Sequence, residues 1–173
     1  MEFKKSKHVR PYVKPVFDLI NEAYSDIYGF APLQEIESKE FSERFLPLLN
    51  PKFIKLVKDK NDKVVAFVVA MPDISDGFKK AKGKLFPLGF IYLLLSFRKA
   101  TQLNLLLGCV KDTIRNSGID ALMAVSMFDS AKDANLKILD SHLIMEENVK
   151  MRAVMERLES TIYKRYRIFE KSI

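Results

Sequence analysis

The residues best suited to chemistry lie in one central stretch of the chain, from Leu103 to Leu122. An apolar run, Leu103–Val110, meets a polar turn at 111–118, and a helical pattern begins at Ile119. A strand that leads through a turn into a helix presents unpaired backbone N–H groups at the positive end of the helix dipole. We therefore expect the turn to bind phosphate, although an ordinary strand–turn–helix would show the same pattern.

The turn has a recognisable order of residues, Arg115-Asn-Ser-Gly-Ile-Asp120. It resembles the Gln/Arg-x-x-Gly-x-Gly/Ala motif of the GNAT N-acetyltransferase superfamily, with Asp120 where the family has Gly or Ala. The resemblance implies that the loop holds the pyrophosphate of acetyl-CoA. The loop residues concerned are Arg115, Asn116, Ser117, Gly118, Ile119 and Asp120. The carboxylate of Asp120 would compete with that pyrophosphate and weaken binding.

The resemblance also assigns a role to the strand before the turn. In the family, the backbone of this strand pairs with the pantetheine arm as an added strand would. The residues implied here are Leu107, Gly108 and Val110. Gly108 would either allow the arm to come close or mark a β-bulge.

A second set of candidates precedes the last helical pattern. Asn148 matches the Asn of the family's Asn-x-x-Ala-x-x-Leu-Tyr motif, which contacts pantetheine, and it would also serve as a helix cap. Met155 occupies the position of the family's general acid, the Tyr, and cannot donate a proton. Tyr163 and Tyr166 are the candidate replacements.

Two carboxylates stand directly before Asn148. Glu146 and Glu147 are candidate catalytic bases that would take the proton from an ammonium acceptor. The alternative is that both complement the positive end of the helix that follows.

The spacing of apolar residues around these candidates predicts alternating helices and strands. Helices are expected at 15–28, 41–49 and 148–158, and a further helix is expected from 119 to about 128 or beyond. The insert at 77–100 is expected to contain one or two helices. Expected strands are a hairpin of 53–58 and 63–71, then 103–110, 138–139 with 143–145, and a closing strand at 161–169. This order is similar to the GNAT core, which implies an α/β fold with a mixed, mostly antiparallel sheet flanked by helices.

We expect one GNAT-like domain over 1–173, with residues 1–10 disordered or the remnant of a first strand. The end of the chain, Tyr163–Lys171, resembles the end of certain bacterial GNAT-like proteins. In those proteins the module is the C-terminal half of a longer chain that carries an additional N-terminal GNAT-like domain.

The insert at 77–100 would form a lid, a dimer contact or part of the core. Membrane attachment is less favoured there, because its lysines cluster at one end rather than along one helical face.

Charge and composition narrow the possible functions. The net charge of +7 arises at the two ends, where 1–15 carries five basic residues against one acidic and 163–173 carries four against one. Two such ends either form one basic patch for nucleotides, nucleic acid or acidic proteins, or are separately solvated.

Cys109 is the only cysteine, and His8 and His142 show no ligand spacing, so no metal site is expected. No signal peptide or membrane-spanning run is apparent, so we expect a cytoplasmic protein.

These features together predict an N-acetyltransferase that uses acetyl-CoA as co-substrate. The acceptor would be an amine of a small molecule or peptide that the sequence does not identify. Direct attack of the amine on the thioester is expected, since Cys109 has no histidine partner. The alternative is a catalytically inactive GNAT-like module that binds nucleic acid or a partner domain through its basic ends. We expect a monomer or homodimer and no membrane partner.

Overall fold

The computed structural model describes residues 1–82, 84, 89–115, 117–141, 143–167, 169 and 171. The chain divides into two compact units, Met1–His142 and Leu143–Ile173. Each unit is described by itself below. The first unit carries the sheet and most of the helices.

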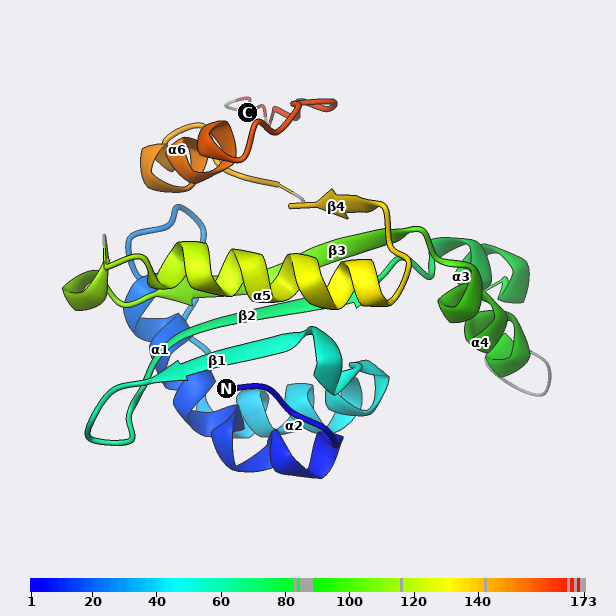
Figure 1. Cartoon of the computed structure of the whole chain (residues 1–173), viewed down its shortest axis with the longest axis horizontal. Coiled ribbons are helices and arrows are strands. Elements are labelled where there is room, and N and C mark those ends of the chain that lie inside the picture. The colour runs from blue at the N-terminus through cyan, green and yellow to red at the C-terminus, as the bar shows by residue number, and fades with distance from the viewer. Residues whose placement is uncertain are drawn as a thin grey trace. The chain divides into compact units, whose positions relative to one another are not determined.

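A mixed sheet of four strands forms the centre of the first unit (Figure 1). Its strands are β1 (Ile54–Lys58), β2 (Val64–Pro72), β3 (Gln102–Val110) and β4 (Ile138–Asp140), in that spatial order. β1 and β3 each pair antiparallel with β2, whereas β4 pairs parallel with β3. The hairpin and the third strand lie where the sequence predicts them, because their β-branched and apolar runs are bounded by turn residues.

The helices of the first unit are α1 (Val13–Ala23), α2 (Glu35–Phe45), α3 (Ser75–Ala81), α4 (Gly89–Lys99) and α5 (Ile119–Asp133). Short 3-10 segments occur at Ser6–His8, Arg10–Tyr12, Leu46–Leu48, Pro51–Phe53 and Asp112–Ile114. The second unit contains α6 (Val149–Arg157). The insert predicted at 77–100 is thus the helix pair α3 and α4. The first helix ends at Ala23, earlier than its apolar spacing suggests, and Gly29 follows a series of turns.

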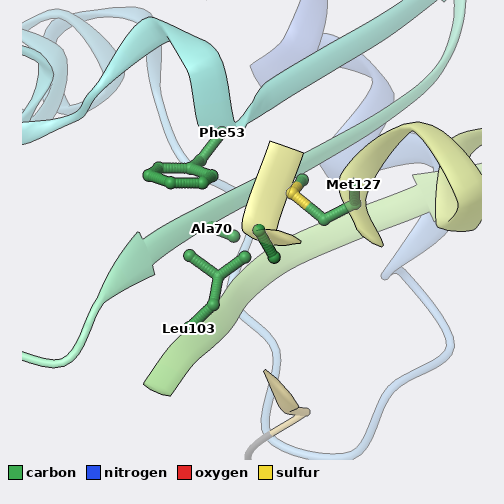
Figure 2. Close-up of a cluster of buried hydrophobic side chains, with 5 residues drawn as sticks. Phe53, Ala70, Leu103 and Met127 are labelled. Atoms are coloured by element: carbon green, nitrogen blue, oxygen red, sulfur yellow. The ribbon is translucent and has the colours of Figure 1, made fainter. Parts of the chain in front are cut away.

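Helices pack against both faces of the sheet. Under α5, a buried cluster joins the sheet to the helix (Figure 2). Its members are Phe53, Ala70, Leu103, Met127 and Ala131. On the other face, α1 contributes Phe17, Leu19 and Ile20, which pack against Phe67 and the partly buried Val69, Leu107 and Cys109. Burial on both faces explains why β2 reads as an almost continuous apolar run.

A β-bulge divides β3 into two halves. Val69 pairs with Leu107 and Ala70 with Leu105, which leaves Leu106 as the extra residue. An extra residue inverts the alternation of side chains along the strand. Leu105 accordingly packs toward α5, whereas Leu107 packs toward α1, although both positions are odd-numbered. The bulge therefore lies at Leu106 and not at Gly108, which pairs regularly with Val68.

Two predicted strands are wrong. Residues 143–145 and the described part of 161–169 have no strand pairing. Ile162, Tyr163 and Tyr166 are each 65% exposed. Apolar and aromatic residues favour a strand only when another strand pairs with it. Among the described residues of the second unit there is no such partner, so high β-propensity alone does not produce a strand.

Candidate functional site

The turn that precedes α5 has the geometry of an anion site. Gly118 adopts a left-handed conformation, φ +82°, directly before the helix. The first helical hydrogen bond runs from the Leu122 N–H to the Gly118 carbonyl, at 2.9 Å. The N–H groups of residues 119–121 therefore have no acceptor within the helix. Gly118 has no side chain with which to cap this end, and a Cβ built on it would meet no atom of the described residues within 4 Å, so the turn is open within the described part of the chain.

The cations beside this turn are already paired with carboxylates. Arg115 forms an ion pair with Asp112 three residues earlier. Lys111 Nζ lies 2.9 Å from a carboxylate oxygen of Glu22 on α1. A bound phosphate would have to share these cations or displace their partners. Asp120 adds a further negative charge in the first turn of α5.

The remaining loop residues predicted to bind pyrophosphate are placed as follows. Ser117 Oγ donates to the Ile114 carbonyl at 2.6 Å, which closes the turn but commits that hydroxyl hydrogen. Ile119 opens α5. Asn116 lies outside the described residues.

The outer edge of β3 beyond Asn104 is the second part of the site. β4 pairs with β3 only through Gln102, Leu103 and Asn104, and within the described part of the first unit no strand continues this pairing. The Lys111 N–H donates to the Val65 carbonyl at 2.8 Å. This bond identifies which residues of β3 exchange backbone hydrogen bonds with β2.

In an antiparallel ladder, residues that exchange backbone bonds alternate with residues whose backbone groups point away. Counting back from Lys111, Cys109 and Leu107 direct their backbone groups to β2. Gly108 and Val110 direct theirs to the open edge. Of the three strand residues predicted to hold pantetheine, Gly108 and Val110 therefore have outward backbone groups, whereas those of Leu107 face the neighbouring strand.

Tyr24 contacts this edge, a role that no pattern in the sequence indicates. Its hydroxyl donates to the Gly108 carbonyl at 2.9 Å, across 84 residues of sequence. Burial raises the pKa of the Tyr24 hydroxyl above its usual range, so the group stays protonated at neutral pH. Tyr24 directly follows α1 and continues the apolar spacing of that helix, which is typical of a core residue. Only the fold places its hydroxyl on β3.

Cys109 is the one thiol in the chain, and its surroundings disfavour the nucleophilic form. Burial raises the pKa of this thiol to about 12, outweighing the opposite effect of nearby Arg115. The thiolate is the reactive form of cysteine. Cys109 packs against the α1 cluster, and a thiol with so high a pKa is a poor nucleophile at neutral pH.

The second unit holds the other predicted residues. Asn148 caps α6, because its side-chain oxygen accepts the Met151 N–H at 3.1 Å. Glu146 and Glu147 lie in the exposed turn before this cap. The Arg152 guanidinium donates to the backbone carbonyl of Glu146 at 3.2 Å. The structure thus brings these three residues together in one turn of the second unit, whereas the Gly118 loop belongs to the first unit.

One hollow of about 380 Å³ is found elsewhere in the first unit. It is lined by Phe128, Ala131, Lys132, Asn135, Leu136, Lys137, Ile138 and Leu139. These residues surround the C-terminal end of α5, whereas the Gly118 turn lies at its N-terminal end. The hollow is therefore not part of the candidate site.

Comparison with known proteins identifies the fold. No family model matches the chain. A solved aminoglycoside acetyltransferase, AAC(6')-Iy in complex with the bisubstrate analogue CoA-S-monomethyl-acetylneamine, superposes with a TM-score of 0.59 at 11% identity, over 95% of this chain and 94% of its own. Aminoglycoside 6'-N-acetyltransferase AAC(6')-IG from Acinetobacter haemolyticus superposes with a TM-score of 0.53 at 14% identity, over 94% of each chain. A structure described as a possible acetyltransferase from Clostridium difficile 630 superposes with a TM-score of 0.57 at 16% identity, over 98% of this chain and 93% of its own. The chain therefore has the mixed α/β fold of these acetyltransferase structures, as the order of elements predicted.

Two curated relatives match in sequence. The Bacterial ceramide synthase of Caulobacter vibrioides (strain NA1000 / CB15N) is 23% identical over 93% of this chain. Protein YghO of Escherichia coli (strain K12) is 29% identical over 90% of it. The chain spans 43% and 41% of the length of these two relatives, respectively.

Proposed function

We propose that this chain is a CoA-dependent N-acyltransferase, for which acetyl-CoA is the simplest donor. The observation that carries the proposal is the open edge of β3, which leads directly into the uncapped turn of Gly118 and α5. The fold is shared with acetyltransferases, one of them solved with an analogue that contains CoA. An extended amide-bearing arm suits a free strand edge, and a pyrophosphate suits a helix N-terminus.

In the proposed reaction, the unprotonated amine attacks the thioester carbonyl and the C–S bond breaks as the amide forms. Glu146 or Glu147 would accept the proton from the amine, and Asn148 would contact the pantetheine arm. The leaving thiolate needs a proton, and Met155 cannot supply one. Tyr24 is a further candidate donor, because its protonated hydroxyl lies at the β3 edge; its hydrogen would have to turn from the Gly108 carbonyl to the thiolate. Tyr163 and Tyr166 stay the candidates of the second unit, where both are largely exposed.

The acceptor class follows from the relative named as a ceramide synthase. A ceramide is an amide between an acyl group and the amine of a long-chain lipid base. The bond made is therefore the bond that a GNAT-like N-acyltransferase would make. We propose a lipid amine as acceptor and a longer acyl-CoA as a second donor to test beside acetyl-CoA.

A second candidate function is a module that binds but does not catalyse. Three observations favour it: Arg115 is already paired with Asp112, Asp120 adds a negative charge to the turn, and Met155 replaces the usual acid. The basic residues at the two ends would then bind nucleic acid or a partner domain. A nucleic-acid-binding module would show an affinity for nucleic acid that falls steeply with salt, whereas an acyltransferase would bind CoA tightly and show little salt dependence towards DNA.

The first experiment is calorimetric titration of the chain with acetyl-CoA and with a long-chain acyl-CoA. Gly118→Glu should abolish binding, because a carboxylate and a strained backbone would replace the open glycine. Asp120→Ala should tighten binding about fivefold, since it removes a charge repulsion of about 1 kcal/mol near the pyrophosphate.

The matched control is Asp129→Ala, an exposed carboxylate further along α5. It lies about 13 Å along the helix axis from Asp120, beyond the screening length at physiological salt, and should leave the affinity unchanged. Absence of binding to either thioester at millimolar concentration would overturn the acyltransferase proposal. Equal effects of the Asp120 and Asp129 variants would remove the turn from the site.

A further inference from the structure

The insert between β2 and β3 is a tightly joined pair of helices. A Cβ built on Gly77 of α3 would lie 2.9 Å from the Tyr92 carbonyl oxygen and 3.1 Å from the Leu93 Cα of α4. The two backbones therefore meet at Gly77, where no larger residue fits without a shift. Leu93, on the contacting side of α4, is only 4% exposed. This contact determines which face of α4 is covered.

The opposite face of α4 is apolar and exposed. Ile91, Leu94 and Leu95 follow one another at the spacing of a single helical face. Their exposed fractions are 49%, 47% and 44%, and the neighbouring Phe90 is 55% exposed. A soluble surface helix normally directs polar residues outward. Such a continuous apolar face indicates an interaction surface.

Basic residues lie at both ends of this apolar face. Arg98 and Lys99 are exposed in the last turn of α4, one helical turn beyond Leu94 and Leu95. At the other end, α3 finishes beside the start of α4, since a Cβ on Gly89 would lie 3.2 Å from the Ala81 Cβ. Exposed lysines of that region are Lys79, Lys80, Lys82 and Lys84.

The insert carries a large excess of positive charge. Between residues 75 and 99 there are six basic side chains and a single carboxylate, a net charge of +5. That carboxylate, Asp76, lies 3.7 Å from Lys79. The surface thus combines exposed aliphatic and aromatic side chains with a strong positive charge.

We propose that the α3–α4 hairpin binds the surface of a membrane that contains anionic phospholipids. The apolar face of α4 would enter the boundary between headgroups and acyl chains, and the basic residues at its ends would contact the headgroup phosphates. A second copy of the chain fits this surface less well, because a symmetric contact would bring two faces of the same charge together. Nucleic acid would match the charge but leave the apolar face exposed.

The binding would be interfacial. None of the helices in the described ranges is long and apolar enough to cross a bilayer. The surface is defined by exposed apolar side chains and positive charge, so it does not depend on acyl transfer. If both proposals hold, the hairpin would bring the enzyme to the phase in which a lipid amine resides.

The chain contains no tryptophan, which allows a direct test. Ile91→Trp places a single fluorophore on the exposed face of α4. With vesicles of equal parts phosphatidylcholine and phosphatidylglycerol, its emission should shift to shorter wavelength as the indole leaves water. Leu122→Trp is the matched control, because Leu122 is a 66% exposed apolar residue on α5; its emission should not shift.

Vesicle co-sedimentation of the unmodified full chain and two variants measures affinity. Ile91→Asp combined with Leu95→Asp should weaken binding about tenfold or more, because two apolar side chains are lost from the interface. Lys79→Glu combined with Lys80→Glu should weaken it about fivefold or more for each lysine, and high salt should act in the same direction. All substituted positions are exposed, and circular dichroism would verify the fold.

Three results would overturn the proposal. The first is absence of binding to the anionic vesicles by the unmodified chain. The second is equal binding to vesicles of phosphatidylcholine alone, because the charge would then have no role. The third is a dimer in light scattering that the Ile91 and Leu95 double variant dissociates without any vesicle binding, which would assign the face to a second copy. Titration of the same variants with acyl-CoA tests the proposed function independently. A chain that binds acyl-CoA but not vesicles would contradict only the membrane proposal.

Discussion

At the scale of single residues, the environment of Cys109 decides between two routes of acyl transfer. A covalent route would need a thiolate next to the bound thioester, and burial suppresses that form. Direct attack by the amine needs no such group. The acyl transfer proposed above therefore depends on a base, a proton donor and backbone amides, and not on the only cysteine.

The first prediction concerns the reactivity of this thiol. At pH 8, alkylation of Cys109 in the folded chain should be about a hundredfold slower, or more, than in urea, because its pKa of about 12 leaves little thiolate. Iodoacetamide labelling followed by mass spectrometry measures both rates. Labelling at comparable rates in the two states would contradict the prediction. Cys109→Ala should also retain any acyl transfer activity.

The same pKa has a consequence for stability. The folded-state pKa is raised above that of the unfolded chain, so the folded state holds the proton more firmly. The resulting stabilisation is complete below about pH 9 and is lost as pH rises toward 12. Cys109→Ala should remove this part of the alkaline decline in urea denaturation.

At the scale of elements, the contact between α3 and α4 depends on one missing side chain. Gly77→Ala would place a methyl group 2.9 Å from the Tyr92 carbonyl oxygen and 3.0 Å from the Ser96 Cβ. Since the first of these atoms belongs to the backbone, the helices must separate. We expect a loss of about 1–3 kcal/mol of unfolding free energy, of the size found for overpacked cores.

Urea denaturation of Gly77→Ala measures this loss. Gly29→Ala is a useful comparison, because a Cβ there meets no atom within 4 Å and only the backbone conformation, φ +75°, opposes it. Unchanged stability of Gly77→Ala would mean that the two helices are not in close contact at this point.

The elements also show what the sequence can and cannot reveal. The hairpin of β1 and β2, strand β3 and the start of α5 at Ile119 were predicted, because local residue types and turn signals determine them. The bulge at Leu106 was not located, since leucine at 105, 106 and 107 suits either face of a sheet that is covered on both sides. The open edge of β3 and the Tyr24 contact depend on pairing between distant segments, which no local pattern encodes.

At the scale of the whole first unit, the N-terminus is joined to the sheet and to α5. Glu2 forms a bridge with Lys55 of β1, and the terminal ammonium group donates to the Leu56 carbonyl at 2.7 Å. The Lys55 side chain is only 4% exposed, and its Nζ lies 2.5 Å from Glu2 Oε1 and 2.7 Å from Ser130 Oγ. Ser126 donates to the same Glu2 oxygen at 2.7 Å.

This network predicts an asymmetric response to mutation. Glu2→Gln should cost about 2 kcal/mol, because it leaves the buried Lys55 ammonium without a carboxylate. Lys55→Met should cost less, since Glu2 is 66% exposed and stays hydrated without its partner. Urea denaturation at pH 7 compares the two variants. A greater loss for Lys55→Met than for Glu2→Gln would contradict this explanation.

The pH dependence of stability should also report on the ion pair of Glu2 and Lys55. Hydrogen bonding to Lys55 lowers the pKa of the Glu2 carboxyl below its usual range. A lowered folded-state pKa contributes stability that is present above about pH 4.5 and is lost as pH falls through the folded value. Glu2→Gln should therefore show a smaller loss of stability between neutral and acid pH than the unmodified chain.

The bulge in β3 has a consequence for how this protein and its relatives can change in length. The strand consists of two halves in opposite phase, and Leu106 absorbs the difference. Deletion of one residue of β3 before Leu107 can be accommodated by loss of the bulge, because the residues from Leu107 onward then keep their partners on β2. The same change after the bulge has no such buffer and would rotate Gly108 and Val110 away from the open edge. Relatives that share the site should therefore vary in length on the α4 side of β3 and keep a constant spacing from the bulge to the turn at Gly118.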